Sequence, residues 1–269
     1  MSDRLDTDLV RRGLARSRGQ ARELIEAGLV TVNGRQVGKG SYAVPPGAVL
    51  TVRDAGPTWV SRAAAKLIGA FAVFGPDGLS ACGRRCADVG ASTGGFTEVL
   101  LHEGAAHVVA IDVGHGQLVP ALAADPRVTE LSGVTVRGLR PGQIGGEVDL
   151  AVADLSFISL PLVMAEIAGL MTTGADAVVL VKPQFEVGRE RLGKNGVVRR
   201  AADRAWAITE VARAAVAVGL TPLGLARSPI PGSTGNVEYL LWLTRRVEAG
   251  MGWEAVVATA DRLSLDGAS

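Results

Sequence analysis

Cysteine, histidine and long apolar runs are all scarce in this chain of 269 residues, and each shortage excludes a class of protein. The two cysteines, Cys82 and Cys86, are too few for a disulfide-stapled scaffold, and the three histidines lack the spacing of zinc ligands. No apolar run reaches the roughly 18 residues of a membrane-spanning helix. The first residues, Met1 to Arg4, do not begin a signal peptide. We therefore expect a cytoplasmic, reduced protein without a metal site.

Lysine is also rare, with four residues against 24 arginines. A chain so biased toward arginine keeps lysine where arginine cannot replace it, either as a base or as a compact point charge. Lys182 directly follows the apolar run 177–181, and Asp154 directly follows the apolar run 150–153. Because the carboxyl ends of parallel strands line the ligand crevice of an open α/β sheet, we expect both side chains there. The plainer alternatives are a surface lysine at a strand edge and an aspartate that caps a helix.

A glycine-rich segment at residues 88–96 lies between a short apolar run and an amphipathic segment. A strand, a glycine turn and a helix start in this order point backbone N–H groups at a ligand. The glycines follow Gly-x-x-x-Gly-Gly, with Asp88 two residues before Gly90, and not the dehydrogenase pattern Gly-x-Gly-x-x-Gly. Asp112 ends the next apolar run, 22 residues after Gly90, where a carboxylate can hold a ribose diol.

This segment resembles the first motif of class I S-adenosylmethionine methyltransferases, Asp-x-Gly-x-x-x-Gly. The resemblance implies S-adenosylmethionine as the cofactor; a glycine turn without any cofactor is the alternative. The residues predicted to bind the cofactor are Asp88, Gly90, Ala91, Ser92, Gly94, Gly95, Phe96, Asp112, Val113 and Asp154.

The first 53 residues are basic, with nine arginines and lysines against five acidic residues, a net charge of +4 that leaves −3 for the rest. Ser17 is a candidate N-cap, and Asn33-Gly34 is typical of a type I′ turn between two strands. The elements expected in this segment are helices at 5–14 and from Ser17 to Gly28, and strands at 29–32, 35–37 and 49–52.

This basic segment resembles the S-four-type RNA-binding domain of ribosomal proteins and pseudouridine synthases, through Arg4-Leu5-Asp6, Ala15-Arg16-Ser17-Arg18 and Val32-Asn33-Gly34. The resemblance implies structured RNA as the partner, met by clustered guanidinium groups that suit phosphate contacts. A second basic segment, residues 186–200, follows Lys182 and lies beside the expected crevice. The residues predicted to contact RNA are Arg4, Arg16, Arg18, Arg22, Arg189, Arg191 and Lys194.

The rest of the chain is predicted to be a larger α/β domain. We expect a small α+β domain at residues 1–54, a linker at 55–60 and the α/β domain at 61–269, which opens with a helix from Ser61 to Phe74 capped by Ser61. Seven strands, the last one antiparallel, would form the Rossmann-like sheet of a class I methyltransferase. They are expected near 86–89, 107–111, 127–131, 148–153, 177–181, 221–226 and 237–243.

The α/β domain resembles the FtsJ-like ribose 2′-O-methyltransferases, whose signature is a Lys-Asp-Lys-Glu tetrad. By motif the tetrad corresponds to Lys66, Asp154, Lys182 and Glu238. With the basic domain in front, residues 4–245 resemble the TlyA (haemolysin A) family of rRNA 2′-O-methyltransferases. The resemblance implies S-adenosylmethionine-dependent methylation of cytidine ribose in 16S rRNA, 23S rRNA or both. We assign Lys182 as the proton acceptor, Asp154 and Glu238 as orienting groups, and Lys66 as a group that positions the hydroxyl.

Two other functions stay open, a membrane-active haemolysin and a non-catalytic RNA-binding factor in ribosome assembly. The absent apolar span counts against the first, and the intact glycine segment and tetrad count against the second. Methylation of an exocyclic amine usually shows Asn/Asp-Pro-Pro-Tyr where this chain has Asp-Leu-Ser-Phe at 154–157. Methylation of a pyrimidine carbon needs a cysteine nucleophile, and both cysteines precede the glycine segment.

Overall fold

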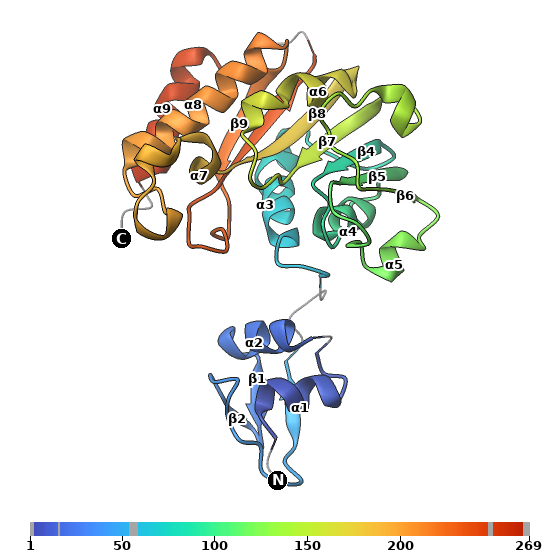
Figure 1. Ribbon diagram of the computed structural model, residues 1–269, viewed down its shortest axis with the longest axis vertical. Coiled ribbons are helices and arrows are strands. Elements are labelled where there is room, and N and C mark those ends of the chain that lie inside the picture. Colours follow the sequence, from blue (N-terminus) through green and yellow to red (C-terminus); the bar gives the residue numbers. More distant parts are fainter. Residues whose placement is uncertain (1–2, 16, 54–58, 247–249, 266–269) are drawn as a thin grey trace. The chain divides into compact units, whose positions relative to one another are not determined.

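The computed structural model describes residues 3–15, 17–53, 59–246 and 250–265. The chain divides into two compact units, residues 1–58 and 59–269 (Figure 1). Most of the linker predicted at 55–60 lies outside the described residues. None of the described helices combines the length and the apolar composition that a membrane-spanning helix needs.

The first unit packs two helices on a three-stranded antiparallel sheet of order β2-β1-β3. Its elements are α1 (Leu5–Arg11), α2 (Arg18–Glu26), β1 (Val30–Val32), β2 (Arg35–Gln36) and β3 (Leu50–Val52). The Ser17 hydroxyl accepts a hydrogen bond from the Gln20 amide at 3.2 Å, which is the predicted cap. Asn33 and Gly34 both have positive φ, as the predicted type I′ turn requires. Helix α1 is three residues shorter than predicted.

The second unit is built on a seven-stranded sheet of order β6-β5-β4-β7-β8-β10-β9. β10 runs antiparallel to both of its neighbours, and the pairs from β6 to β8 are parallel. From β4 the chain proceeds to β5 and β6 on one side and later to β7 and β8 on the other, so the order reverses between β4 and β7. The carboxyl ends of these two strands therefore flank the crevice of the sheet. The strands are β4 (Arg85–Val89), β5 (His107–Asp112), β6 (Val128–Ser132), β7 (Val148–Ala153), β8 (Met171–Val181), β9 (Thr221–Arg227) and β10 (Tyr239–Thr244).

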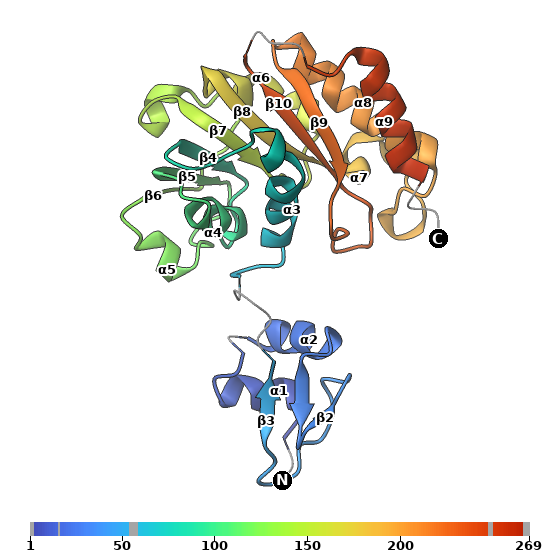
Figure 2. The same ribbon diagram turned by 180° about the vertical axis from the view of Figure 1, so that it is seen from behind.

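Helices cover both faces of this sheet (Figures 1 and 2). One hydrophobic cluster joins the strands to α6, α8 and α9, and a second joins the opposite face to α3 and α4. Strands that are buried on both faces consist of nearly continuous apolar residues, so their positions could be predicted from apolar runs in the sequence. The predicted fold class is confirmed. The helices are α3 (Ala64–Phe74), α4 (Gly95–His102), α5 (Pro120–Ala123), α6 (Met164–Gly169), α7 (Pro183–Glu186), α8 (Ala201–Ala217) and α9 (Trp253–Leu265).

In the second unit, the starts of one helix and one strand differ from the prediction by three residues or more. Helix α3 begins at Ala64, and Ser61 does not cap it. The Val60 amide donates to the Glu98 carboxylate at 2.6 Å, and this contact with α4 holds the residues before α3 in a separate turn. Strand β8 begins at Met171, six residues before its predicted start, because its first half pairs with β7 and β10 at the far edge of the sheet.

Candidate active site

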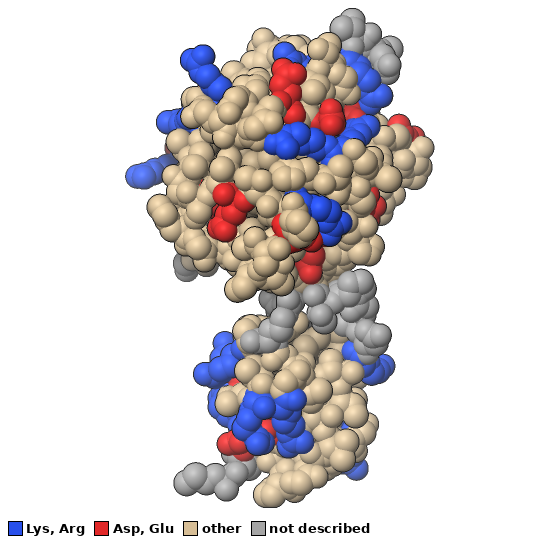
Figure 3. Space-filling view, turned by 90° about the vertical axis from the view of Figure 1, so that its right-hand side faces the viewer, with Lys and Arg blue, Asp and Glu red and all other residues tan. Residues whose placement is uncertain are grey.

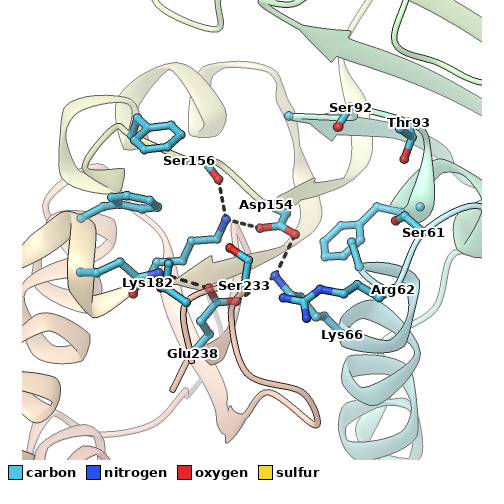
Figure 4. A pocket seen from close by; sticks show the side chains of 18 of the residues that line it. Ser61, Arg62, Lys66, Ser92, Thr93, Asp154, Ser156, Lys182, Ser233 and Glu238 are labelled. Atoms are coloured by element: carbon cyan, nitrogen blue, oxygen red, sulfur yellow. Dashed lines mark hydrogen bonds and ion pairs between the residues drawn. The ribbon is translucent and has the colours of Figure 1, made fainter. Parts of the chain in front are cut away.

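The four residues of the predicted tetrad come together although they lie up to 172 positions apart in the chain. Lys66 belongs to α3, Asp154 and Lys182 directly follow β7 and β8, and Glu238 directly precedes β10. Lys66 Nζ lies 3.2 Å from Asp154 Oδ2 and 2.8 Å from Glu238 Oε2, and Lys182 Nζ lies 2.6 Å from Asp154 Oδ1. Figure 4 shows the two ammonium groups reaching the same carboxylate from different elements. No helix begins at Asp154, so the helix-cap alternative does not hold.

The tetrad is buried and internally neutral. Lys66, Lys182 and Glu238 are each less than a tenth exposed. Two positive and two negative charges balance one another, which is the arrangement that makes buried ions tolerable. Lys182 also donates to the Ser156 hydroxyl at 3.0 Å, and the Gln184 amide donates to Glu238 Oε1 at 3.3 Å. These polar contacts fix both ends of the tetrad.

The tetrad lines a cavity of about 500 Å³, which we call the tetrad cavity. An ammonium group has three N–H donors, and the Lys182 ammonium donates one of them to Ser156 while it forms an ion pair with Asp154. A hydroxyl group entering this cavity would therefore meet an N–H donor and carboxylate acceptors at one point. The cavity is also lined by Ser61, Arg62, Gly90, Ala91, Ser92, Gly95, Phe96, Phe157, Phe185, Asn195 and Ser233, among others.

A second cavity of about 440 Å³, the loop cavity, lies between the carboxyl ends of β4, β5 and β7. Asp112 and Val113, two of the residues predicted to bind the cofactor, line it together with apolar side chains that include Val134, Val136 and Ile158. Asp112 Oδ2 accepts from the Ser92 amide at 2.8 Å, and Oδ1 accepts from the Gly114 amide at 2.7 Å. Since a carboxylate oxygen has further acceptor capacity, Asp112 can still hold a hydroxyl. Both cavities are lined by Gly90, Ser92, Asp154, Ser156 and Phe157.

The three glycines of the glycine-rich segment serve different purposes. Gly90 has φ +89°, and a Cβ there would lie 3.0 Å from the Asp154 carbonyl oxygen, so this glycine lets two strand ends approach. Gly95 lines the tetrad cavity and abuts Ser61. A Cβ at Gly94 would meet Leu118 and Leu122, so Gly94 serves packing and lines neither cavity.

Asp88 also differs from the expected picture, because it is completely buried beneath the segment and lines neither cavity. The Thr97 hydroxyl donates to its Oδ2 at 2.7 Å, while Oδ1 has no hydrogen-bond partner. Burial raises the pKa of the Asp88 carboxyl to about 7, and the nearby carboxylates of Asp154 and Asp112 add to this rise.

Replacing Asp88 by asparagine should stabilise the second unit more at pH 8 than at pH 5. The pKa of the Asp88 carboxyl is about 3.9 in the unfolded chain and about 7 in the folded chain. Between these two pH values the carboxyl is ionised in the unfolded chain but protonated in the folded one. The free energy of unfolding of wild type therefore falls over this range by roughly 1.4 kcal/mol per pH unit. That of Asp88→Asn does not, because asparagine does not ionise. All four tryptophans lie in the second unit, so urea unfolding followed by tryptophan fluorescence reports on it.

The Asp125→Asn variant, at a partly exposed position, is the control for Asp88→Asn. Arg127 holds the pKa of Asp125 at about 2, so Asp125 is ionised in both states throughout pH 5 to 8. An Asp88→Asn effect that is the same at both pH values would contradict the raised pKa.

Sequence reasoning missed several residues around the tetrad cavity. Ser156 and Gln184 each lie two positions after a tetrad member, and this spacing is a signal that could have identified them. Arg62 also lines the cavity, and its guanidinium is exposed. Phe157 is 92% exposed, has φ +62° and packs against Phe185 with ring centroids 5.2 Å apart. An exposed aromatic side chain in a strained backbone conformation beside a cavity makes Phe157 a candidate ligand contact.

The predicted RNA-contacting residues fall into two groups. Arg4, Arg18 and Arg22 converge on the carboxylate of Asp6 in the first unit. Figure 3 shows lysine and arginine side chains gathered on the face of this unit that it presents. Arg16 lies outside the described residues.

The second group is only partly free for an outside partner. Arg189 is exposed, whereas the Arg191 guanidinium stacks 4.5 Å from the centre of the Trp206 ring and faces Asp203 at 4.0 Å. The structure does not describe the side chain of Lys194. The segment that carries them is anchored by a small cluster of Val187, Val198 and Ala207.

Comparison with known proteins identifies both units. The model of the FtsJ-like methyltransferase family matches residues 59–245, and that of the S4 domain matches residues 3–50. Over 249 residues the chain is 53% identical to the 16S/23S rRNA (cytidine-2′-O)-methyltransferase TlyA of Mycobacterium tuberculosis, covering 92% of each protein.

Two further relatives carry another name. The chain is 36% identical to Hemolysin A of Brachyspira hyodysenteriae, with 88% of this chain and 98% of that protein covered. A solved structure from Streptococcus thermophilus, named as a candidate hemolysin, matches with a TM-score of 0.74 and 37% identity, covering 98% of each chain. The family predicted from the tetrad and the basic domain is confirmed: the chain belongs to the FtsJ-like methyltransferases and, among them, to the TlyA family, with an S4 domain in front.

Proposed function

We propose that this protein transfers a methyl group from S-adenosylmethionine to the ribose 2′-oxygen of a cytidine in 16S or 23S ribosomal RNA. The observation that carries the proposal is the chain of ion pairs Glu238–Lys66–Asp154–Lys182, which lines a cavity that shares lining residues with a second cavity. A hydroxyl acceptor needs hydrogen-bond donors and proton acceptors at one place, and the tetrad offers both. The cytidine substrate of the Mycobacterium tuberculosis relative supports the choice of nucleoside.

The loop cavity fits an adenosine-like cofactor. Asp112 offers carboxylate oxygens to a ribose diol, and Val134, Val136 and Ile158 offer apolar surface to a flat ring. Ser92 and Asp154 border both cavities, which would bring the methyl donor next to the acceptor. When bound, S-adenosylmethionine supplies an electrophilic methyl group on a sulfonium.

The residues of the tetrad then have separate tasks. Lys66 bridges Asp154 and Glu238 and holds the ribose hydroxyl in place. Lys182, held by Asp154 and Ser156, lines the cavity, and in its uncharged amine form it takes the proton that the hydroxyl loses. Because two lysines and two carboxylates lie in contact, the proton is shared by a coupled set and belongs to no single residue.

Other features of the chain suit an RNA substrate. The S4 domain carries exposed arginine side chains, which bind phosphates through their planar array of N–H donors. Phe157 and Phe185 border the tetrad cavity and offer ring faces on which an unstacked nucleobase can stack.

The decisive experiment incubates the purified protein and S-adenosylmethionine with ribosomal subunits and maps the methyl groups by mass spectrometry. We expect 2′-O-methylcytidine with wild type and none with Lys182→Ala. Methyl groups on a base would contradict the ribose assignment. Methylation that persists in Lys182→Ala would contradict the tetrad. Equal amounts of modified rRNA in cells with and without the gene would leave only the non-catalytic role in ribosome assembly.

Asp112→Ala should weaken S-adenosylmethionine binding by about 1–3 kcal/mol, the usual effect of leaving a polar group unpaired. The change removes the acceptor for a ribose diol, and it also frees the Ser92 and Gly114 amides that Asp112 holds. Calorimetric titration of wild type, Asp112→Ala and Asp112→Asn measures the effect. Asparagine keeps one acceptor oxygen and should bind with intermediate affinity. Unchanged affinity in both variants would remove Asp112 from the cofactor site, and tight binding of NAD would contradict the cofactor assignment.

The hemolysin names of two relatives suggest a second candidate function. A buried tetrad of four charges has no evident use in the disruption of a membrane. Measuring erythrocyte lysis by wild type and by Lys182→Ala separates the two functions, and equal lysis by both would mean that any haemolytic effect is independent of the tetrad.

A further inference from the structure

The basic face of the S4 domain is organised by one buried carboxylate, Asp6. It is completely buried, and its two oxygens accept hydrogen bonds from Arg4 Nε at 3.1 Å, Arg4 Nη2 at 3.0 Å, Arg22 Nε at 3.2 Å and Arg18 Nη2 at 3.4 Å. The hydrogen bond from Arg4 is the main reason why the pKa of Asp6 lies well below its usual range, so Asp6 stays ionised at neutral pH.

The three arginines come from different parts of the domain and keep most of their donors for an outside partner. Arg4 precedes α1, and Arg18 and Arg22 lie on α2. Their side chains are each about half exposed. A guanidinium has five N–H donors, so four hydrogen bonds to Asp6 leave most of the fifteen free. Three positive charges around one negative charge leave a net charge of +2, whereas an ordinary ion pair within a fold is neutral.

We infer that Asp6 is a positioning residue for RNA binding, which holds Arg4, Arg18 and Arg22 in a fixed array that fits neighbouring phosphates of an RNA backbone. The inference rests on the proposed function, in which rRNA is the substrate. Long arginine side chains lose conformational freedom when they bind, and Asp6 imposes part of that order before the RNA arrives.

Charge and geometry predict opposite results for Asp6→Asn. The substitution raises the net charge of residues 1–53 from +4 to +5, so long-range attraction alone would make RNA binding tighter. If positioning matters, the guanidinium groups lose their common anchor and binding weakens. We expect weaker binding, by at least about tenfold, and a smaller dependence on salt because fewer phosphate contacts form.

Asp8→Asn is the matched control. Asp8 lies on the same helix, is 1% exposed and pairs with Arg11 and Arg12, so its replacement changes charge and burial in the same way. Asp6→Glu is the second test variant, because it keeps the net charge and moves the carboxylate by one methylene. We expect Asp8→Asn to bind RNA at least as tightly as wild type and Asp6→Glu to bind more weakly.

The experiment titrates full-length variants into ribosomal subunits and measures affinity at several salt concentrations, with circular dichroism to confirm folding. Arg4→Ala combined with Arg18→Ala gives the effect of losing the arginines themselves. Weakening by Asp6→Asn and Asp6→Glu but not by Asp8→Asn supports the inference. Equal or tighter binding by Asp6→Asn overturns it, and so does equal weakening by Asp6→Asn and Asp8→Asn.

The same experiment separates this inference from the proposed function. If the arginine variant binds as tightly as wild type, the inference fails while methylation of rRNA by wild type still stands. If wild type neither binds nor methylates ribosomal subunits, both fail.

Discussion

Lys182→Arg is expected to slow methyl transfer to rRNA by at least about 100-fold, within the range that a general base contributes. Arginine keeps the positive charge but does not give up its proton in a protein, whereas lysine can. Its planar fork also cannot reproduce the short contact of the Lys182 ammonium with Asp154 or the hydrogen bond to Ser156. Lys182→Ala should be no less active than Lys182→Arg if proton acceptance, and not positive charge, is the decisive role.

Single-turnover methyl transfer to ribosomal subunits between pH 6 and 9 measures this effect. S-adenosylmethionine affinity, measured by calorimetry, should change little in both variants, because Lys182 does not line the loop cavity. An arginine variant with a nearly normal rate would mean that Lys182 only positions the ribose. The proton would then have to go elsewhere, and the assignment of the base would be abandoned.

The strand ends were predictable from the sequence because the sheet is covered on both faces. Apolar runs that stop at Asp112, Asp154 and Lys182 mark the carboxyl ends of three parallel strands, and those ends meet at one edge of the sheet. The scarcity of lysine then singled out Lys182. Lys66 and Glu238 could be predicted only from the resemblance to a family. Lys66 lies in a helix and Glu238 in a loop, and the composition of neither segment indicates that its side chain reaches the tetrad cavity.

The purposes of individual side chains were less predictable, because they depend on contacts between distant segments. Gly94 matches a ligand-binding motif, but its φ of +101° favours glycine, and Leu118 and Leu122 pack against its backbone. Asp88 stands where a cofactor contact was expected, yet Thr97 is its hydrogen-bond partner below the segment. The contact of Asp6 with Arg22 joins two helices, and no periodicity in the sequence indicates it.

Asp154 connects the chemistry of the two cavities. One oxygen contacts Lys182 and the other contacts Lys66, and the same residue lines both the tetrad cavity and the loop cavity. Gly90 lets the β4 end approach the backbone of Asp154, and both residues line the loop cavity and the tetrad cavity. A side chain at Gly90 would therefore disturb both sites at once, which explains why the fold keeps glycine in this left-handed position.

Lys66→Met should both destabilise the second unit and abolish methyl transfer. The substitution leaves Glu238, which is 2% exposed, without its cation at 2.8 Å, and breaking a buried ion pair in this way costs about 3–5 kcal/mol. Adding Glu238→Gln removes the stranded charge while Gln184 can still hydrogen-bond to position 238. The double variant should therefore recover most of the lost stability but none of the activity, because the ammonium that holds the ribose hydroxyl is still absent.

Tryptophan-detected urea unfolding and single-turnover methyl transfer, applied to both single variants and the double variant, form a cycle that separates stability from chemistry. Arg84→Met is the matched control, because it removes a partner of the buried Asp176 at 2.7 Å at the opposite end of the sheet. It should lower stability, less than Lys66→Met does since Arg246 still pairs with Asp176, and leave the rate per folded molecule unchanged. If the Lys66→Met/Glu238→Gln double variant regained methyl transfer together with stability, the Lys66–Glu238 pair would be structural only, and the catalytic set would shrink to Asp154 and Lys182.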